Sequence, residues 1–126
     1  MPAINFHAQF ADAVKRGEKR QTIRARGKRN PPRVGDPLFL YTGMRTAACR
    51  KLATAPCAAV ELITIDAERG EVTMPRSFGG HQAWTRLDTE EVEQLARDDG
   101  FADVAAFFEW FRANHGKTMS GYLIRW

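Results

Sequence analysis

The 126-residue sequence has no hydrophobic run long enough to cross a bilayer. A membrane-spanning helix needs about 20 consecutive apolar residues, and charged residues interrupt the apolar stretches of this chain well before that length. Residues 1–5 also lack the basic segment followed by an apolar run that marks a secretory signal. We therefore expect a cytoplasmic protein that has no membrane partner.

Cysteine and histidine are scarce, with two and three copies. Cys49 and Cys57 have seven residues between them and no CxxC spacing, so they indicate neither a disulfide framework nor a zinc site. His7, His81 and His115 are far apart in the sequence, and we interpret none of them as a metal ligand or a catalytic base. We expect no metal site and no cofactor, and a divalent ion would be expected only if the protein were a nuclease.

Acidic residues are rare in the first half of the chain. Residues 15–51 contain twelve lysines and arginines but only two acidic residues, whereas most acidic residues lie in 88–109. Together with a net charge of +4, this split is typical of a nucleic-acid binder that has one basic face and one acidic face. We predict RNA contacts from Arg20, Arg24, Arg26, Lys28, Arg29, Arg45, Arg50 and Lys51, and stacking on an unpaired base by Trp84.

Hydrophobic residues make up 44% of the chain, which at this length suits one domain with a single core. Helices are predicted over residues 5–16, 88–98 and 104–115, where apolar residues recur at helical spacing. Gly17 would end the first helix. Asp88 and Glu91 have the spacing of a capping box, which marks the start of the second.

Strands are predicted at residues 22–24, 38–41, 58–66, 72–74 and 119–126. Residues 25–36 are rich in glycine, proline and cations and predict a basic loop. Residues 47–54 fit either a helical turn or a strand, and residues 75–84 are predicted to be irregular. Because the helices do not alternate with every strand, we expect an α+β fold: a small curved barrel or open sheet with helices packed on it.

The most chemically suggestive segment is residues 16–24. Lys19 and Thr22 lie where the first helix would meet a strand, and a buried Ile23 would turn Thr22 and Arg24 towards a common cleft. A threonine hydroxyl becomes a nucleophile when a base removes its proton, and lysine can be that base if its pKa is lowered. The alternative interpretation is a solvated basic loop followed by a core strand.

A lysine–threonine pair needs a carboxylate to move protons. Asp98 and Asp99 lie together at the end of the predicted second helix, where negative charge is unfavourable for the helix dipole. Residues that break a local rule in this way are often functional, so we take Asp99 as the candidate. Its alternative interpretation is an ordinary Asp-Gly turn with Gly100.

A longer pattern joins these segments. It runs Phe6-x3-Phe10-x3-Val14-x2-Gly17-x-Lys19-x2-Thr22-Ile23-Arg24, followed by Val34-Gly35-Asp36 and Asp99-Gly100-Phe101. Over nearly the whole chain, this pattern resembles the ASCH domain. The resemblance implies one domain over residues 1–126 with a PUA-like β-barrel of five to six strands and two to three packed helices. It also implies a cleft lined by Lys19, Thr22 and Arg24.

The resemblance further implies a link to RNA. Some members of the family resemble RNA-binding modules, some are ribonucleases, and small single-domain members are amidohydrolases that remove the acyl group of N4-acetylcytidine. In that branch, residues that match Lys19 and Thr22 act with a glutamate. The position that matches the glutamate here is Asp99, which is one methylene shorter, and Glu93 is the alternative carboxylate.

Three functions stay open at this point. The first is an RNA-directed protein that holds phosphates on its basic face and a single-stranded base in its cleft, with or without ribonuclease activity. The second is an amidohydrolase of N4-acylated cytidine with Thr22 as nucleophile, Lys19 as base and Asp99 as proton shuttle. The third is a non-catalytic interaction module that recruits partners through its acidic helices.

Overall fold

Three helices and eight strands make up the computed structural model, which describes residues 2–126. The strands are β1 (Ala3–Phe6), β2 (Gln21–Ala25), β3 (Pro37–Thr42), β4 (Arg50–Pro56), β5 (Ala59–Asp66), β6 (Glu71–Phe78), β7 (His81–Arg86) and β8 (Thr118–Arg125). The helices are α1 (Ala8–Lys15), α2 (Thr89–Asp98) and α3 (Val104–His115). The predicted α+β class is confirmed, and the strands outnumber the five to six that we expected.

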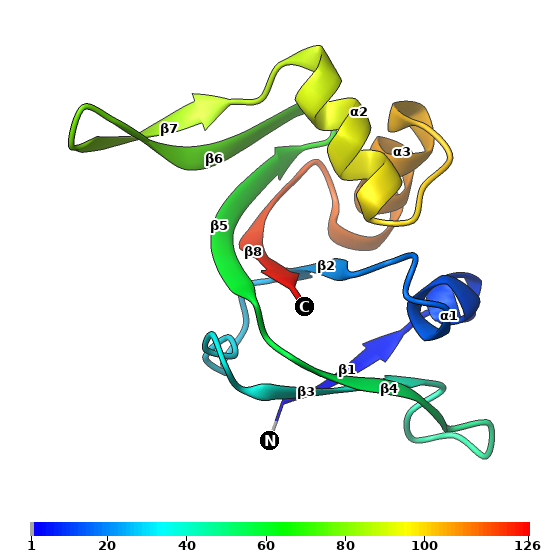
Figure 1. Ribbon diagram of the computed structural model, residues 1–126. Helices are drawn as coiled ribbons and strands as arrows, with labels where there is room; N and C mark the ends of the chain where they lie inside the picture. The colour runs from blue at the N-terminus through cyan, green and yellow to red at the C-terminus, as the bar shows by residue number, and fades with distance from the viewer. Residues whose placement is uncertain (1) are drawn as a thin grey trace.

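The strands form two sheets, neither of which closes into a barrel. One sheet has the order β1-β3-β4, with β1 parallel to β3 and β3 antiparallel to β4. The other has the order β2-β8-β5-β6-β7, and its neighbours are all antiparallel. The chain bends from β4 into β5 and so passes from one sheet to the other (Figure 1).

The first helix is shorter than predicted because a strand precedes it. The helix begins at Ala8, and Ala3–Phe6 instead pairs in parallel with β3. Ile4 and Phe6 are buried while their neighbours along the strand are exposed, which is the alternation of a half-buried strand. Pairing with a distant segment thus overrides the helical spacing that includes Phe6.

The hairpin of β6 and β7 is a second correction. Residues 75–84, which the sequence predicts to be irregular, continue β6 to Phe78 and begin β7 at His81. Gly79 and Gly80 between them have φ angles of 53° and 88°, as the favoured two-residue hairpin turn requires. The hairpin extends away from the remaining strands (Figure 1). For residues 47–54, the strand alternative holds from Arg50 onwards.

The start and end of α2 agree with the sequence prediction. Asp88 accepts a hydrogen bond from the backbone N–H of Glu91 at 2.8 Å, and the Glu91 side chain accepts one from the backbone N–H of Asp88 at 3.0 Å. Asp99 is the C-cap, and Gly100, with φ 96°, turns the chain towards α3. This turn places Asp99 and Phe101 in the interior.

Phe101 joins the turn after α2 to the core. Its ring meets Phe10 of α1 at 5.3 Å and Phe107 of α3 at 5.5 Å between centroids, both edge-on. These are favourable distances and angles for aromatic pairs. The turn that carries Asp99 is therefore held between two helices.

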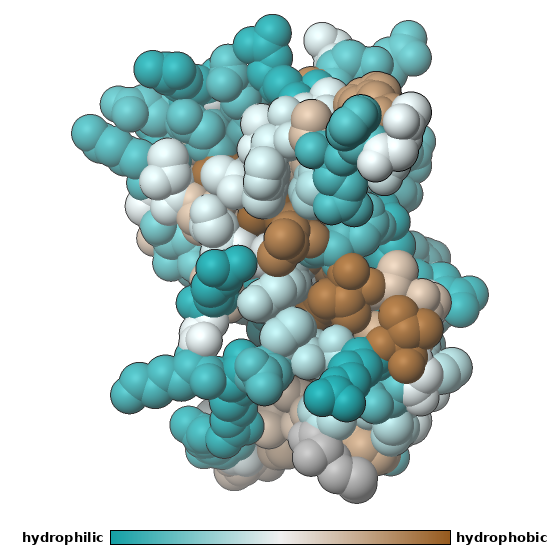
Figure 2. Space-filling model, turned by 90° about the vertical axis from the view of Figure 1, so that its left-hand side faces the viewer, coloured by the Kyte–Doolittle hydropathy of each residue, from teal (hydrophilic) through white to brown (hydrophobic). Residues whose placement is uncertain are grey.

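The molecular surface is mixed. Figure 2 views the side on which the β6–β7 hairpin lies in Figure 1, and it shows hydrophilic side chains above and below a central group of hydrophobic ones. Within residues 2–126, no helix has both the length and the apolar character that crossing a membrane requires.

Candidate active site

A cavity of about 200 Å³ lies where β2, α1, α3 and the turn after α2 meet. Its polar lining includes Lys19, Thr22, Arg24, Asp99 and His115. Its aromatic lining includes Phe6, Phe10, Phe101, Trp110 and Phe111. The structure thus brings the three predicted catalytic residues, which are up to 80 positions apart in the sequence, to one cavity.

Lys19 is directed into the cavity by the end of α1. Gly17, with φ 78°, ends the helix, and the backbone N–H of Lys19 donates to the carbonyl of Ala13 at 3.1 Å. Only 3% of the Lys19 side chain is exposed. Its ammonium lies 4.9 Å from the centroid of the Phe10 ring, close enough for a cation–π contact.

Asp99 is the direct partner of Lys19. The Lys19 ammonium lies 3.2 Å from Asp99 Oδ1 and donates to the Asp99 carbonyl at 2.5 Å. Gln21 Nε2 donates to Oδ1 as well, at 3.2 Å. Glu93, the alternative carboxylate, is exposed on α2 and does not line the cavity. The geometry therefore selects Asp99 as the carboxylate of the site.

Burial moves the pKa values of this pair towards each other. Desolvation lowers the pKa of Lys19 below its ordinary 10.5, and the negative charge of Asp99 only partly opposes that shift. Desolvation likewise raises the pKa of Asp99 above 3.8, against the opposing effect of Lys19. Transfer of a proton between the two groups is therefore easier here than in water.

Thr22 has a different partner from the one we expected. Its Oγ1 accepts a hydrogen bond from Arg24 Nε at 3.0 Å, rather than bonding to Lys19. Arg24 is held in turn by a bond from Nη2 to the carbonyl of Asn5 at 2.8 Å and by the face of Phe6, 5.1 Å from the ring centroid. A guanidinium beside the hydroxyl oxygen would stabilise negative charge on that oxygen.

The α3 wall of the cavity was not foreseen as part of a site. His115 stacks on Phe111 with 5.7 Å between ring centroids, and Trp110 meets His7 edge-on at 5.5 Å. Desolvation, together with the positive charge of Arg24, lowers the pKa of His115 below 6.5. The only sequence signal for this wall is that Phe111 and His115 are four residues apart on the same helix, which could equally have meant core packing.

The predicted RNA contacts are not gathered at the cavity, apart from Arg24. Arg26 lies over the Tyr122 ring at 5.8 Å, and Lys51 over the Phe39 ring at 5.4 Å. Arg20 donates to the carbonyl of Trp126 at 3.2 Å. The other four, Lys28, Arg29, Arg45 and Arg50, have exposed side chains outside the cavity lining.

Trp84 belongs to β7, which lies on the opposite side of the molecule from α1 (Figure 1). It pairs with Pro75 of β6 and is 55% exposed. The structure therefore does not bring it together with the cavity. If this side chain stacks on a base, that base is bound separately from any ligand of the cavity.

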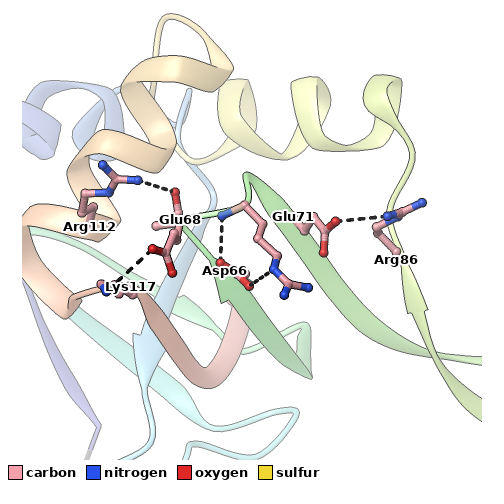
Figure 3. Close-up of polar contacts among 8 residues, drawn as sticks. Asp66, Glu68, Glu71, Arg86, Arg112 and Lys117 are labelled. Carbon is pink, nitrogen blue, oxygen red and sulfur yellow. Dashed lines mark hydrogen bonds and ion pairs between the residues drawn. The ribbon is translucent and has the colours of Figure 1, made fainter.

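Many acidic side chains form ion pairs with basic residues that are not among the predicted RNA contacts. Figure 3 shows one such region, where Glu68 lies 3.7 Å from Lys117 and Glu71 lies 3.1 Å from Arg86. None of the eight predicted contact cations forms an ion pair within residues 2–126. Their charges are therefore available to an external anion.

In the described part of the chain, no group of three or more histidine, cysteine, aspartate or glutamate side chains is arranged to hold a metal ion. Comparisons with family models, curated proteins and solved structures found no match to this chain.

Proposed function

We propose that the protein is an amidohydrolase that removes the acyl group from N4-acylated cytosine, and that residues 1–126 form a single ASCH-like domain with a PUA-like fold. One observation carries this proposal. A lysine and an aspartate, both almost fully buried, meet at 3.2 Å on the wall of an aromatic cavity that a threonine also lines. Burying an ion pair is costly, so such a pair at a cavity supports a catalytic role over a purely structural one.

Each polar group has a step in the proposed reaction. A proton first passes from the Lys19 ammonium to Asp99, which leaves Lys19 neutral. Thr22 Oγ1 then forms a bond to the acyl carbon while its proton passes to Lys19 and the π electrons of the acyl carbonyl move to its oxygen. The bond from the acyl carbon to N4 then breaks, and N4 receives a proton from the Lys19–Asp99 pair. Water hydrolyses the acyl ester on Thr22, which releases the carboxylic acid and restores the hydroxyl. Arg24, whose Nε donates to Oγ1, lies beside the reacting carbon and would stabilise the negative charge that develops on the acyl oxygen.

The aromatic walls fit a planar base. Phe6, Phe10 and Trp110 enclose the polar groups in apolar surface, which strengthens electrostatic interactions by excluding water. A cavity of about 200 Å³ is smaller than the roughly 300–1,000 Å³ typical of sites for drug-sized ligands. It therefore suits a base and its acyl group rather than a larger substrate in its entirety.

The test is the ultraviolet change when purified protein acts on N4-acetylcytidine. We expect hydrolysis by the wild type and at least a roughly 100-fold slower reaction in both Lys19→Ala and Thr22→Ala, because each loses a reacting group. Arg69→Ala removes an exposed charge outside the cavity lining and should retain wild-type activity. If the wild type does not hydrolyse N4-acetylcytidine, the proposal is wrong.

Binding of single-stranded RNA is a second candidate, and the unpaired cations favour it. If about four phosphates are contacted, raising salt from about 50 to 200 mM should weaken binding about 50-fold, because each contact contributes a slope of about −0.7. A fluorescence titration with single-stranded RNA measures this dependence. Affinity that is insensitive to salt would contradict the electrostatic basis of RNA binding.

Ribonuclease activity is less well supported by the geometry. Cleavage would need Lys19 and Asp99 to meet the RNA backbone, but their side chains are only 3% and 6% exposed. They lie inside the cavity rather than among the exposed cations. We expect labelled single-stranded RNA to stay intact with the purified protein, and cleavage that disappears in Lys19→Ala would instead favour a nuclease.

A further inference from the structure

A second hollow, of about 630 Å³, lies directly beside the cavity. Its walls come from the first residues of β1, the end of β2, the loop at residues 29–32 and β8. Arg24 and Ala25 line both spaces. We call the second hollow the Arg24 groove, and a ligand that fills the cavity could continue past Arg24 into it.

Arg24 has hydrogen-bond donors left over at this junction. A guanidinium has five N–H donors. Nε donates to Thr22 and one Nη2 hydrogen donates to Asn5, while Nη1 has no hydrogen-bond partner within residues 2–126. No carboxylate of the described chain forms an ion pair with Arg24. The Arg24 guanidinium is therefore fixed in place and can still bind an anion in a bidentate manner.

The rest of the Arg24 groove combines apolar surface with positive charge. Ile4, Tyr122 and Ile124 line it, and Arg29 adds a second cation. Arg26 lies over the Tyr122 ring and adds a third beside the groove. An aromatic or apolar surface with cations around it is the usual arrangement for a stacked base and its phosphate.

One acidic side chain also lines the groove. Asp36 is engaged with the loop, because its Oδ2 accepts a hydrogen bond from the backbone N–H of Arg33 at 2.9 Å. The three cations thus outnumber this single carboxylate. The balance of charge favours a phosphate over a cationic or neutral group.

We propose that the Arg24 groove binds the phosphate and the neighbouring nucleotide of single-stranded RNA, so that the substrate is an acylated cytosine within RNA rather than a free nucleoside. This inference rests on the proposed function, which assigns the base to the cavity. The sizes agree with it: the cavity of about 200 Å³ suits the base and its acyl group, and the groove of about 630 Å³ has room for the adjoining phosphate and nucleotide. Arg24 then contacts both the reacting hydroxyl and the adjoining phosphate.

The test compares two substrates of the 126-residue protein, N4-acetylcytidine and a five-nucleotide single-stranded RNA with one N4-acetylcytidine at its centre. We expect kcat/KM to be at least about tenfold higher for the RNA, since a hydrogen bond to a charged group contributes about 1.5–3 kcal/mol. Arg29→Ala should reduce kcat/KM for the RNA at least about five times more than for the nucleoside, chiefly through KM. Arg69→Ala, which removes the same charge elsewhere, should change neither value.

Binding of unmodified RNA supplies a readout that does not depend on hydrolysis. Five linked cytidines should bind at least about tenfold more tightly than cytidine, and Arg29→Ala should weaken that binding more than Arg69→Ala does. Equal affinities, or equal losses in the two variants, would overturn the groove assignment even if N4-acetylcytidine is hydrolysed. If neither substrate is hydrolysed but the preference for linked cytidines holds, the proposed hydrolase is wrong and the groove stands.

Discussion

At the scale of single residues, Lys19 and Asp99 depend on each other. Each is buried, and each supplies the opposite charge that offsets the desolvation of its partner. Removing one partner of a buried pair leaves an uncompensated charge, whereas removing both leaves none. The pair should therefore show strong coupling in folding stability as well as in activity.

A double-mutant cycle measures that coupling. We expect Asp99→Asn and Lys19→Met each to lower the free energy of unfolding by about 3–5 kcal/mol. The combined variant should lose less than the sum, with a coupling energy of about 1–3 kcal/mol. Urea denaturation gives the four stabilities, and simple additivity would mean that the two side chains do not interact as the structure shows.

The pH dependence of stability tests His115. Desolvation and the charge of Arg24 lower the pKa of His115 in the folded state, so the unfolded chain binds more protons as the pH falls. The contribution of His115 to the free energy of unfolding is therefore fully present above about pH 6.5, the ordinary histidine pKa. It is lost as the pH falls through the lower pKa that His115 has in the folded state. The raised pKa of Asp99 acts in the opposite sense, because it contributes stability at low pH that is lost as the pH rises.

We therefore expect His115→Gln to reduce the loss of unfolding free energy between about pH 7 and pH 5, measured by urea denaturation at each pH. His81→Gln is the matched control, since that histidine is exposed on β7. An unchanged pH dependence in His115→Gln would contradict the account of the cavity wall.

At the scale of elements, the turn after α2 is the critical connection. Gly100 has φ 96°, and a Cβ there would come within 3.1 Å of the Phe10 ring and 3.3 Å of Lys19 Cδ. A side chain at this position would therefore both strain the backbone and disturb the lysine. The glycine is required by the close approach of α1 as well as by the turn itself.

We expect Gly100→Ala to lower the free energy of unfolding by about 2–3 kcal/mol, since strain and crowding add. Gly79→Ala provides the control, because Gly79 has φ 53° in the β6–β7 turn but a Cβ at that position would meet no atom within 4 Å. That control should lose only about 1 kcal/mol, from backbone strain alone. Equal losses in the two variants would indicate that contact with Phe10 and Lys19 does not matter.

The elements also show what local patterns can predict. The capping box of α2 and the glycine after α3 were predictable because their interactions span a few residues. β1 was not, because its pairing partner β3 lies more than 30 positions further along the chain. The two adjacent glycines within residues 75–84 were a turn signal, but we predicted irregular structure there, and the β6–β7 hairpin shows that this prediction was wrong.

At the scale of the whole molecule, the predicted α+β class holds, whereas closure of a barrel does not follow from the sheet pairings. Lys19, Thr22 and Asp99 were identifiable from residue chemistry and resemblance, and the fold brings them to one cavity. The bond from Arg24 to Thr22 and the α3 wall depend on tertiary packing, which residue spacing does not encode. The same holds for the Arg24 groove, whose walls come from distant segments.

The charge distribution also belongs to this scale. Acidic side chains pair with cations outside the predicted RNA contacts, and those contacts keep their charge. Among these cations, Arg24 lines the cavity, and Arg24 and Arg29 line the groove beside it. We propose that these two arginines hold the polyanion while the cavity takes one base. The central claim is that the hydroxyl of Thr22 carries out the chemistry in that cavity.

The most direct measurement of that claim is the turnover of N4-acetylcytidine by the wild type, Thr22→Ser and Thr22→Val, with each variant first shown to be folded by its thermal unfolding. Valine keeps the shape of threonine and removes the hydroxyl, whereas serine keeps the hydroxyl. We predict measurable turnover in Thr22→Ser and a loss of at least about 1,000-fold in Thr22→Val, on the order of the loss of a nucleophile. Turnover by Thr22→Val within about twofold of the wild type would contradict the account.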